Sequence, residues 1–114
     1  MIRVIHQGIR LYIDPADVLY AQRPGDEHDA VARLQGGAVK LPCKTSLSLL
    51  AGQYPHLVLV HRNALVNRDF IKSVVPLARR ADGCTVILKN DVQIHGSRRF
   101  YADWLADPDR ALAA

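Results

Sequence analysis

The sequence has little of what membrane, metal-binding or disulfide-bonded proteins use. No apolar run approaches the roughly 20 residues that a membrane-spanning helix needs, and no charged-then-apolar leader follows Met1. The two cysteines form no CxxC pair and have no histidine at metal-ligand spacing. We therefore expect a cytosolic protein with two reduced, partly buried thiols and with no membrane segment, metal or cofactor.

The sequence also lacks the usual signs of an active site. There is no Gly-x-Ser-x-Gly elbow, no phosphate-binding glycine loop and no pair of carboxylates against an apolar wall. A hydrolase would have to use Ser97 with His95 or His61 and an Asp, and an adjacent serine and histidine do not make a triad. We predict that the protein is not an enzyme.

What the sequence does have is an uneven distribution of positive charge. The net charge is +4 over 114 residues, but residues 30–102 hold eleven Lys and Arg against three Asp and Glu, so the surplus lies in the middle and later parts. Such a surplus suits a polyanionic partner, although basic side chains also serve simply to solvate a surface. The length fits one domain over residues 1–114, with a tail at 106–114.

Short segments of alternating apolar and polar residues predict a mostly β protein with nine or ten strands and two short helices. Asp14-Pro15 predicts a single helical turn. Thr45 or Ser46 would cap the first helix, from about residue 47 to 53, and Ser97 would cap the second. The apolar stripe of the second helix is expected to comprise Phe100, Tyr101, Trp104 and Leu105.

Polar donors gather directly after one apolar strand, in the segment that begins His61-Arg62-Asn63 and ends at Asn67. We expect a surface prong here, because the planar guanidinium of Arg62 suits a guanine edge or a phosphate and Asn63 can both donate and accept. The alternative is a solvated loop in which His61 and Asn67 only satisfy backbone groups. The sequence leaves both interpretations open.

A second polar segment reads His95-Gly96-Ser97-Arg98-Arg99, which we interpret as a strand, a glycine hinge, a helix cap and two arginines in the first helical turn. Cations at a helix N-terminus oppose the helix dipole, so a purely structural design would place acids there. Free backbone N–H groups together with arginine form an anion site. The segment therefore favours binding of a phosphate-bearing partner.

The two segments, in this order and in this strand context, resemble the LytTR (LytR/AlgR-type) DNA-binding domain. In that family the first motif reads roughly His-Arg-Ser-Tyr-Leu-Val-Asn and the second Pro-Val-Ser-Arg-Arg, and the resemblance extends from about Ile2 to Leu105. Asn63-Ala64 stand where Ser-Tyr is commoner, and His95-Gly96 replace Pro-Val.

The resemblance implies an elongated stack of small antiparallel sheets whose loops enter successive major grooves of double-stranded DNA. Contacts would come from the loop after the third strand, the prong and the Ser-Arg-Arg step. Arg62 and Arg99 would contact bases, whereas His61, Ser97 and Arg98 would hold phosphate. The first loop, Asp26-Glu27-His28-Asp29, is acidic, which opposes contact with DNA. The implied DNA-binding residues are His28, His61, Arg62, Asn63, Ser97, Arg98 and Arg99.

The resemblance further implies a bacterial transcription regulator, either stand-alone or the output domain of a response regulator, because 114 residues leave no room for a receiver domain. Two copies would bind two direct repeats in the DNA. The alternative is a protein-interaction module of the same fold, which would modulate another regulator without binding DNA.

Overall fold

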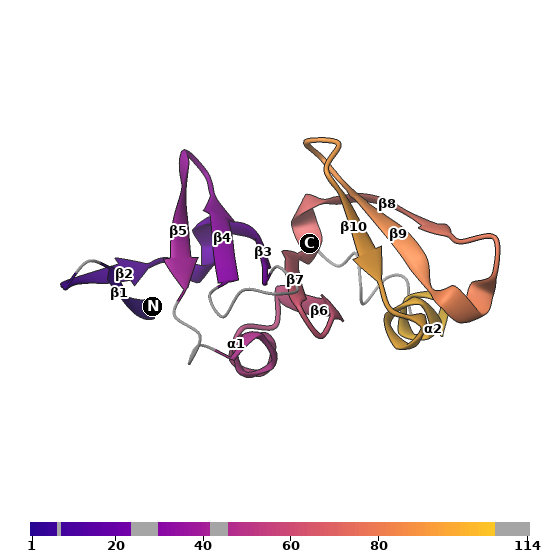
Figure 1. The fold of residues 1–114 in the computed structure, drawn as a ribbon, viewed down its shortest axis with the longest axis horizontal. Coiled ribbons are helices and arrows are strands. Elements are labelled where there is room, and N and C mark those ends of the chain that lie inside the picture. Colours follow the sequence, from indigo (N-terminus) through magenta and orange to yellow (C-terminus); the bar gives the residue numbers. More distant parts are fainter. Residues whose placement is uncertain (7, 24–29, 42–45, 107–114) are drawn as a thin grey trace.

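The computed structural model describes residues 1–6, 8–23, 30–41 and 46–106. Within them the chain is mostly β, as the sequence predicts. There are ten strands, two α-helices and three short 3-10 turns (Figure 1). The strands are β1 (Ile2–His6), β2 (Ile9–Ile13), β3 (Val18–Gln22), β4 (Ala30–Leu34), β5 (Gly37–Leu41), β6 (Leu57–His61), β7 (Ala64–Asn67), β8 (Ile71–Pro76), β9 (Cys84–Leu88) and β10 (Gln93–Gly96).

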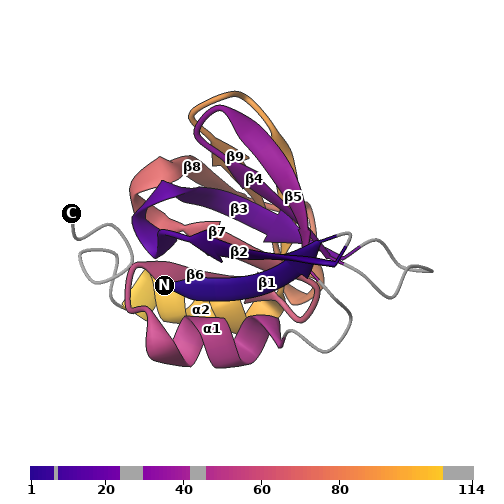
Figure 2. The same ribbon diagram turned by 90° about the vertical axis from the view of Figure 1, so that its left-hand side faces the viewer.

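The strands form three antiparallel sheets that follow one another along the longest axis of the molecule. A five-stranded sheet of order β5-β4-β3-β7-β6 occupies the middle, with the β1-β2 hairpin at one end and the sheet β10-β9-β8 at the other (Figure 1). The molecule measures 44 × 32 × 25 Å, so it is elongated. The two helices, α1 (Leu47–Gln53) and α2 (Arg98–Ala106), lie on the same side of the sheets, as Figure 2 shows.

The five-stranded sheet separates two hydrophobic cores. Side chains alternate across a strand, so successive residues of β7 enter different cores: Leu65 packs with β1, β2 and α1, whereas Ala64 and Val66 pack with β8, β9 and α2. Strand β6 divides in the same way, with Leu57 on one face and Val60 on the other. Because both of its faces are covered, β7 is buried along its whole length.

Helix caps lie where the residue types predict them. The Asp14 carboxylate accepts from the Ala16 N–H at 3.0 Å and starts the first 3-10 turn. Ser46 caps α1, since its Oγ accepts from the Leu49 N–H at 3.2 Å. Thr45, the other expected cap, lies outside the described residues. Leu47 and Leu50 of α1 are buried.

The stripe expected on α2 is partly wrong. Phe100 and Tyr101 are buried and Trp104 packs beside them, but Leu105 is 56 % exposed. The helix ends one residue later, at Ala106, so the final turn extends past the core that it would need to cover. None of the helices in the described residues is both long and apolar enough to span a membrane.

Candidate nucleic-acid interface

The prong is the tight turn between β6 and β7. His61 ends β6, Arg62 and Asn63 form the turn, and Ala64 begins β7. The pairing of β6 with β7 shifts by one residue between Leu59 and His61. Such an irregularity changes the direction of a strand end and re-aims its side chains. The turn therefore projects Arg62, which is exposed, beyond the end of a sheet that both cores hold in place.

Asn67, at the far end of the same motif, has a structural role. Its side chain is 8 % exposed; the amide donates to the Val18 carbonyl at 3.1 Å and its oxygen accepts from the Asp69 N–H at 3.0 Å. The interpretation that Asn67 satisfies backbone groups is therefore confirmed. We therefore restrict the prong to residues 61–63.

The Ser-Arg-Arg step is a capped helix start, as predicted. The Ser97 Oγ accepts from the Phe100 N–H at 3.1 Å, and the Ser97 carbonyl accepts from the Tyr101 N–H at 3.0 Å. Arg98 and Arg99 follow in the first turn of α2, which contains no acidic residue, and both are exposed. The hydroxyl hydrogen of Ser97 remains available for donation, because Oγ acts as an acceptor in the cap.

The hinge that the sequence suggests at Gly96 is instead a close packing contact. Gly96 ends β10, is buried, and pairs with Cys84 of β9. A Cβ atom at this position would lie 2.6 Å from the Cys84 Sγ and 3.1 Å from both Phe100 and Val86. Cys84 is fully buried rather than partly buried, and burial raises the pKa of its thiol. Cys43 lies outside the described residues.

A second glycine, Gly83, lies directly before β9 and packs against the same step. Gly83 has φ +99°, in the left-handed region that favours glycine, and a Cβ there would lie 2.2 Å from the Gly96 carbonyl oxygen. It would also lie 3.1–3.2 Å from the backbone of Ser97 and Arg98. The two glycines therefore let β9 and β10 approach each other closely, and this close approach sets the position of the first turn of α2, which carries Arg98 and Arg99.

Backbone hydrogen bonds bring the two predicted segments together. The Ser97 N–H donates to the Val60 carbonyl at 2.7 Å, which joins the start of α2 to the end of β6, next to the prong. The Arg23 N–H donates to the Asn63 carbonyl at 2.8 Å. Arg23 directly follows β3, so the start of the third predicted segment adjoins the prong as well. His28, the contact expected in that segment, lies outside the described residues.

Two histidines meet where the segments adjoin. The rings of His61 and His95 are 5.5 Å apart between centroids, edge to face. The His61 Nδ1 also lies 3.3 Å from the Asn63 N–H and accepts from it, which shapes the turn. Burial, the neighbouring His95 and Arg62 all lower the pKa of His61. The neutral form of His61 is therefore favoured, and Arg62 lies beside it. The sequence did not predict this ring contact.

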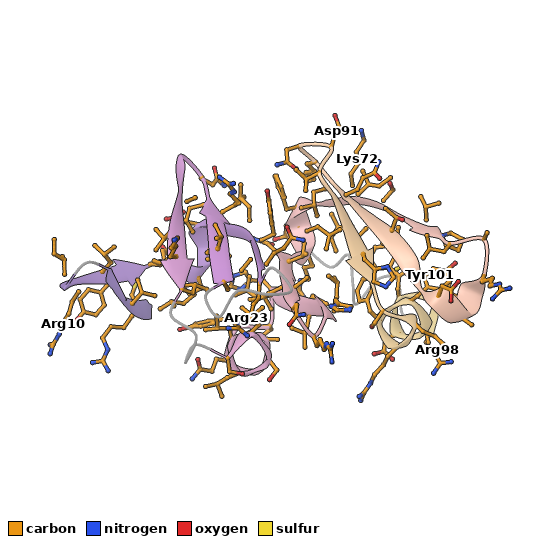
Figure 3. All side chains as sticks on the ribbon, viewed as in Figure 1. Arg10, Arg23, Lys72, Asp91, Arg98 and Tyr101 are labelled. Carbon is orange, nitrogen blue, oxygen red and sulfur yellow. The ribbon has the colours of Figure 1, made fainter. Side chains whose placement is uncertain are left out.

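The arginines of the prong and of the first turn of α2 form no ion pairs among the described residues. Within the described residues, none of Arg62, Arg98 and Arg99 forms a salt bridge. Figure 3 shows Arg98 extending from α2 away from the ribbon at the bottom of the view, whereas the ion pair of Lys72 with Asp91, at 3.0 Å, lies at the top. We call the edge formed by residues 61–63 and 95–99 the basic edge.

The chain belongs to the family of LytTr DNA-binding domains, whose model matches residues 10–105. That is a family of DNA-binding domains and not of enzymes. Among solved structures, the chain is similar to the LytTr DNA-binding domain of a protein described as a methyl-accepting/DNA response regulator from Bacillus cereus. The two share 16 % identity with a TM-score of 0.67, over 99 % of this chain and 96 % of that one, so this likeness concerns the fold. No curated protein matches the sequence.

Proposed function

We propose that the protein binds double-stranded DNA sequence-specifically through the basic edge and thereby regulates transcription. Arg62 and Arg99 contact base edges in the major groove, since each offers planar paired donors that match guanine. His61, Ser97, Arg98 and Asn63 contact the phosphate backbone and set the register. His28, which lies outside the described residues, is a further proposed contact on the ground of the family resemblance alone.

One observation carries this proposal: the prong and the start of α2 are joined by the hydrogen bond from Ser97 to Val60 and by the contact of His61 with His95. Two arginine-bearing segments that are more than thirty residues apart in the chain are thus held on a rigid scaffold. A fixed spacing between Arg62 and Arg99 is what reading a defined base sequence requires, because each must meet its own base pair. Charge on a solvated surface needs no such arrangement.

Each copy presents a small basic edge, so one copy touches few base pairs. We therefore propose that two copies occupy two direct repeats, where the second binding event profits from a raised effective concentration. Gel filtration with and without a two-repeat duplex tests this stoichiometry. A tight dimer without DNA would contradict it.

In vitro selection from random duplexes tests the function. We expect enrichment of a short motif that occurs twice, and binding to the selected duplex should weaken steeply between about 50 and 200 mM salt. Failure to enrich any motif would contradict DNA reading and would favour a module that binds another regulator. A protein interface dominated by apolar contacts would show little salt dependence.

Two neighbouring arginines give a matched pair of variants. Arg99→Ala should cost about 1–3 kcal/mol of binding free energy and relax the preference at one base pair. Arg98→Ala should weaken binding to all duplexes alike and reduce the salt slope by about one. Titration of the selected duplex and of its single-base variants at several salt concentrations separates the two effects. Unchanged binding in both variants would show that the basic edge does not face DNA.

A further inference from the structure

A groove of about 460 Å³ lies between the end of the five-stranded sheet and α2. Strand β6 is an edge strand of that sheet, and the residues of α2 line the opposite wall. The volume lies within the range, roughly 300–1,000 Å³, of pockets that hold small molecules. The wall from β6 and the segment before it is apolar and comprises Pro55, Leu57, Val58 and Leu59.

The opposite wall combines aromatic rings with charge. Phe100 and Trp104 of α2 line the groove, with their ring centroids 6.0 Å apart, and Trp104 is only half-buried. Two arginines, Arg68 and Arg99, also line the groove, against one acidic residue, Asp103. The groove therefore offers apolar walls together with a net positive charge.

From this combination we propose that the groove binds a small amphipathic carboxylate, with an aromatic or aliphatic body between β6 and Trp104 and its carboxylate on Arg99. An apolar body alone would make no use of Arg99, and an inorganic anion alone would leave the apolar walls exposed to water. Planar bidentate pairing with a guanidinium is the strongest polar contact that such a ligand can make. Ser97 also lines the groove, at the same end as Arg99.

The groove and the basic edge share Arg99 and Ser97, which gives the ligand a consequence. An Arg99 side chain paired with a carboxylate is not available to a base edge, so ligand and DNA compete for it. This coupling rests on the proposed function, whereas binding of the ligand itself does not. The groove would thus make the affinity for DNA depend on a small organic acid.

The single tryptophan of the chain gives a local readout, because Trp104 lines the groove. The probe is 4-phenylbutyrate, and the uncharged control compound is 4-phenylbutanamide. Trp104 fluorescence is excited at the red edge of the tryptophan absorption band, where neither compound absorbs. We expect saturable change with the carboxylate, and binding of the amide at least about tenfold weaker. Equal binding of both probes, or of neither, would overturn the proposal.

Three variants locate the charge. Arg99→Gln should remove the preference for the carboxylate, whereas Arg98→Gln, one residue away and not lining the groove, should leave probe binding unchanged. Asp103→Asn should tighten binding of 4-phenylbutyrate about two- to fivefold. An identical response of the first two variants would overturn the proposal. So would a fluorescence response to a short peptide of alternating Leu and Glu but none to the small acid, since this would assign the groove to a protein partner.

The coupling is measured separately, by titrating 4-phenylbutyrate into the complex with the selected duplex. Release of DNA at the concentrations that change Trp104 fluorescence is the expected result. Saturable, Arg99-dependent binding of the probe with no effect on DNA would keep the groove as a ligand site and contradict the role given to Arg99 on DNA. Sequence-specific DNA binding without any probe binding would leave the proposed function intact and overturn the groove.

Discussion

Adding one methyl group at Gly96 should destabilise the protein mainly through its contact with the Cys84 sulfur. In Gly96→Ala the new Cβ would meet the Cys84 Sγ at 2.6 Å, closer than non-bonded atoms approach, and would press on Phe100 and Val86 at 3.1 Å. Overpacking of this kind costs about 1–3 kcal/mol, of which the lower conformational entropy of the unfolded chain offsets about 0.4–1 kcal/mol. We expect a net loss of about 1–2 kcal/mol.

The sulfur can be removed, which turns this expectation into a double-mutant cycle. Cys84→Ala alone leaves a small void in the core around β8, β9 and α2 and should cost about 1–2 kcal/mol. In Gly96→Ala/Cys84→Ala the new methyl group occupies part of that void. We expect the double variant to be more stable than the sum of the single effects predicts, by about 1 kcal/mol or more.

Urea unfolding of the four proteins, followed by circular dichroism, measures the coupling energy. Gly83→Ala is the matched control, because its Cβ would meet the Gly96 carbonyl oxygen and the residue sits at φ +99°, so removal of the Cys84 sulfur cannot relieve it. Strictly additive effects of Gly96→Ala and Cys84→Ala would refute the close-packing explanation. Equal rescue of Gly83→Ala would refute it as well.

Two further predictions concern His61 and Asn67. DNA phosphate should raise the lowered pKa of His61, so binding takes up a proton and the affinity for DNA rises as pH falls towards the pKa of the free protein, by at most tenfold per pH unit; the slope should flatten in His61→Gln. Because the pKa of His61 is lowered in the folded protein, its contribution to the stability of the free protein is complete above about pH 6.5 and is lost as pH falls through the folded-state pKa. DNA titrations and thermal melts across this pH range measure the change in affinity and the change in stability. An affinity for DNA that does not depend on pH would contradict the predicted proton uptake. Asn67→Ala should cost about 2–3 kcal/mol in urea unfolding because the buried Val18 carbonyl and the part-buried Asp69 N–H lose their partner, whereas Asn90→Ala, which loses one exposed bond at 3.2 Å, should cost below about 1 kcal/mol; equal losses would contradict the buried role.

Local chemistry made much of the fold predictable. Alternation of apolar residues located the strands, and hydroxyl or carboxylate caps located the helix starts, because these signals act over a few neighbouring residues. Ser46 and Ser97 cap the helices as their types predict. The family resemblance added the order of the sheets, which no local signal carries.

What the sequence did not predict depends on neighbours distant in the chain. The contact that excludes a side chain at Gly96 comes from Cys84 and Phe100, so a glycine that looks like a hinge is a packing position. Leu105 fits the helical stripe, yet the core ends before it. The pairing of His61 with His95 requires two strands of different sheets to adjoin. Sequence reasoning also missed that Arg23 adjoins the prong; the signal that could have indicated it is a basic residue directly after a predicted strand.

The buried central strand has a consequence for how the protein unfolds. Since β7 supplies alternate side chains to both cores, neither half can melt and leave the other with an intact wall. Damage among β8–β10, far from the N-terminal hairpin, should therefore be felt there as reduced protection from solvent. We therefore expect the two ends of this long molecule to unfold together, although they belong to different sheets and different cores.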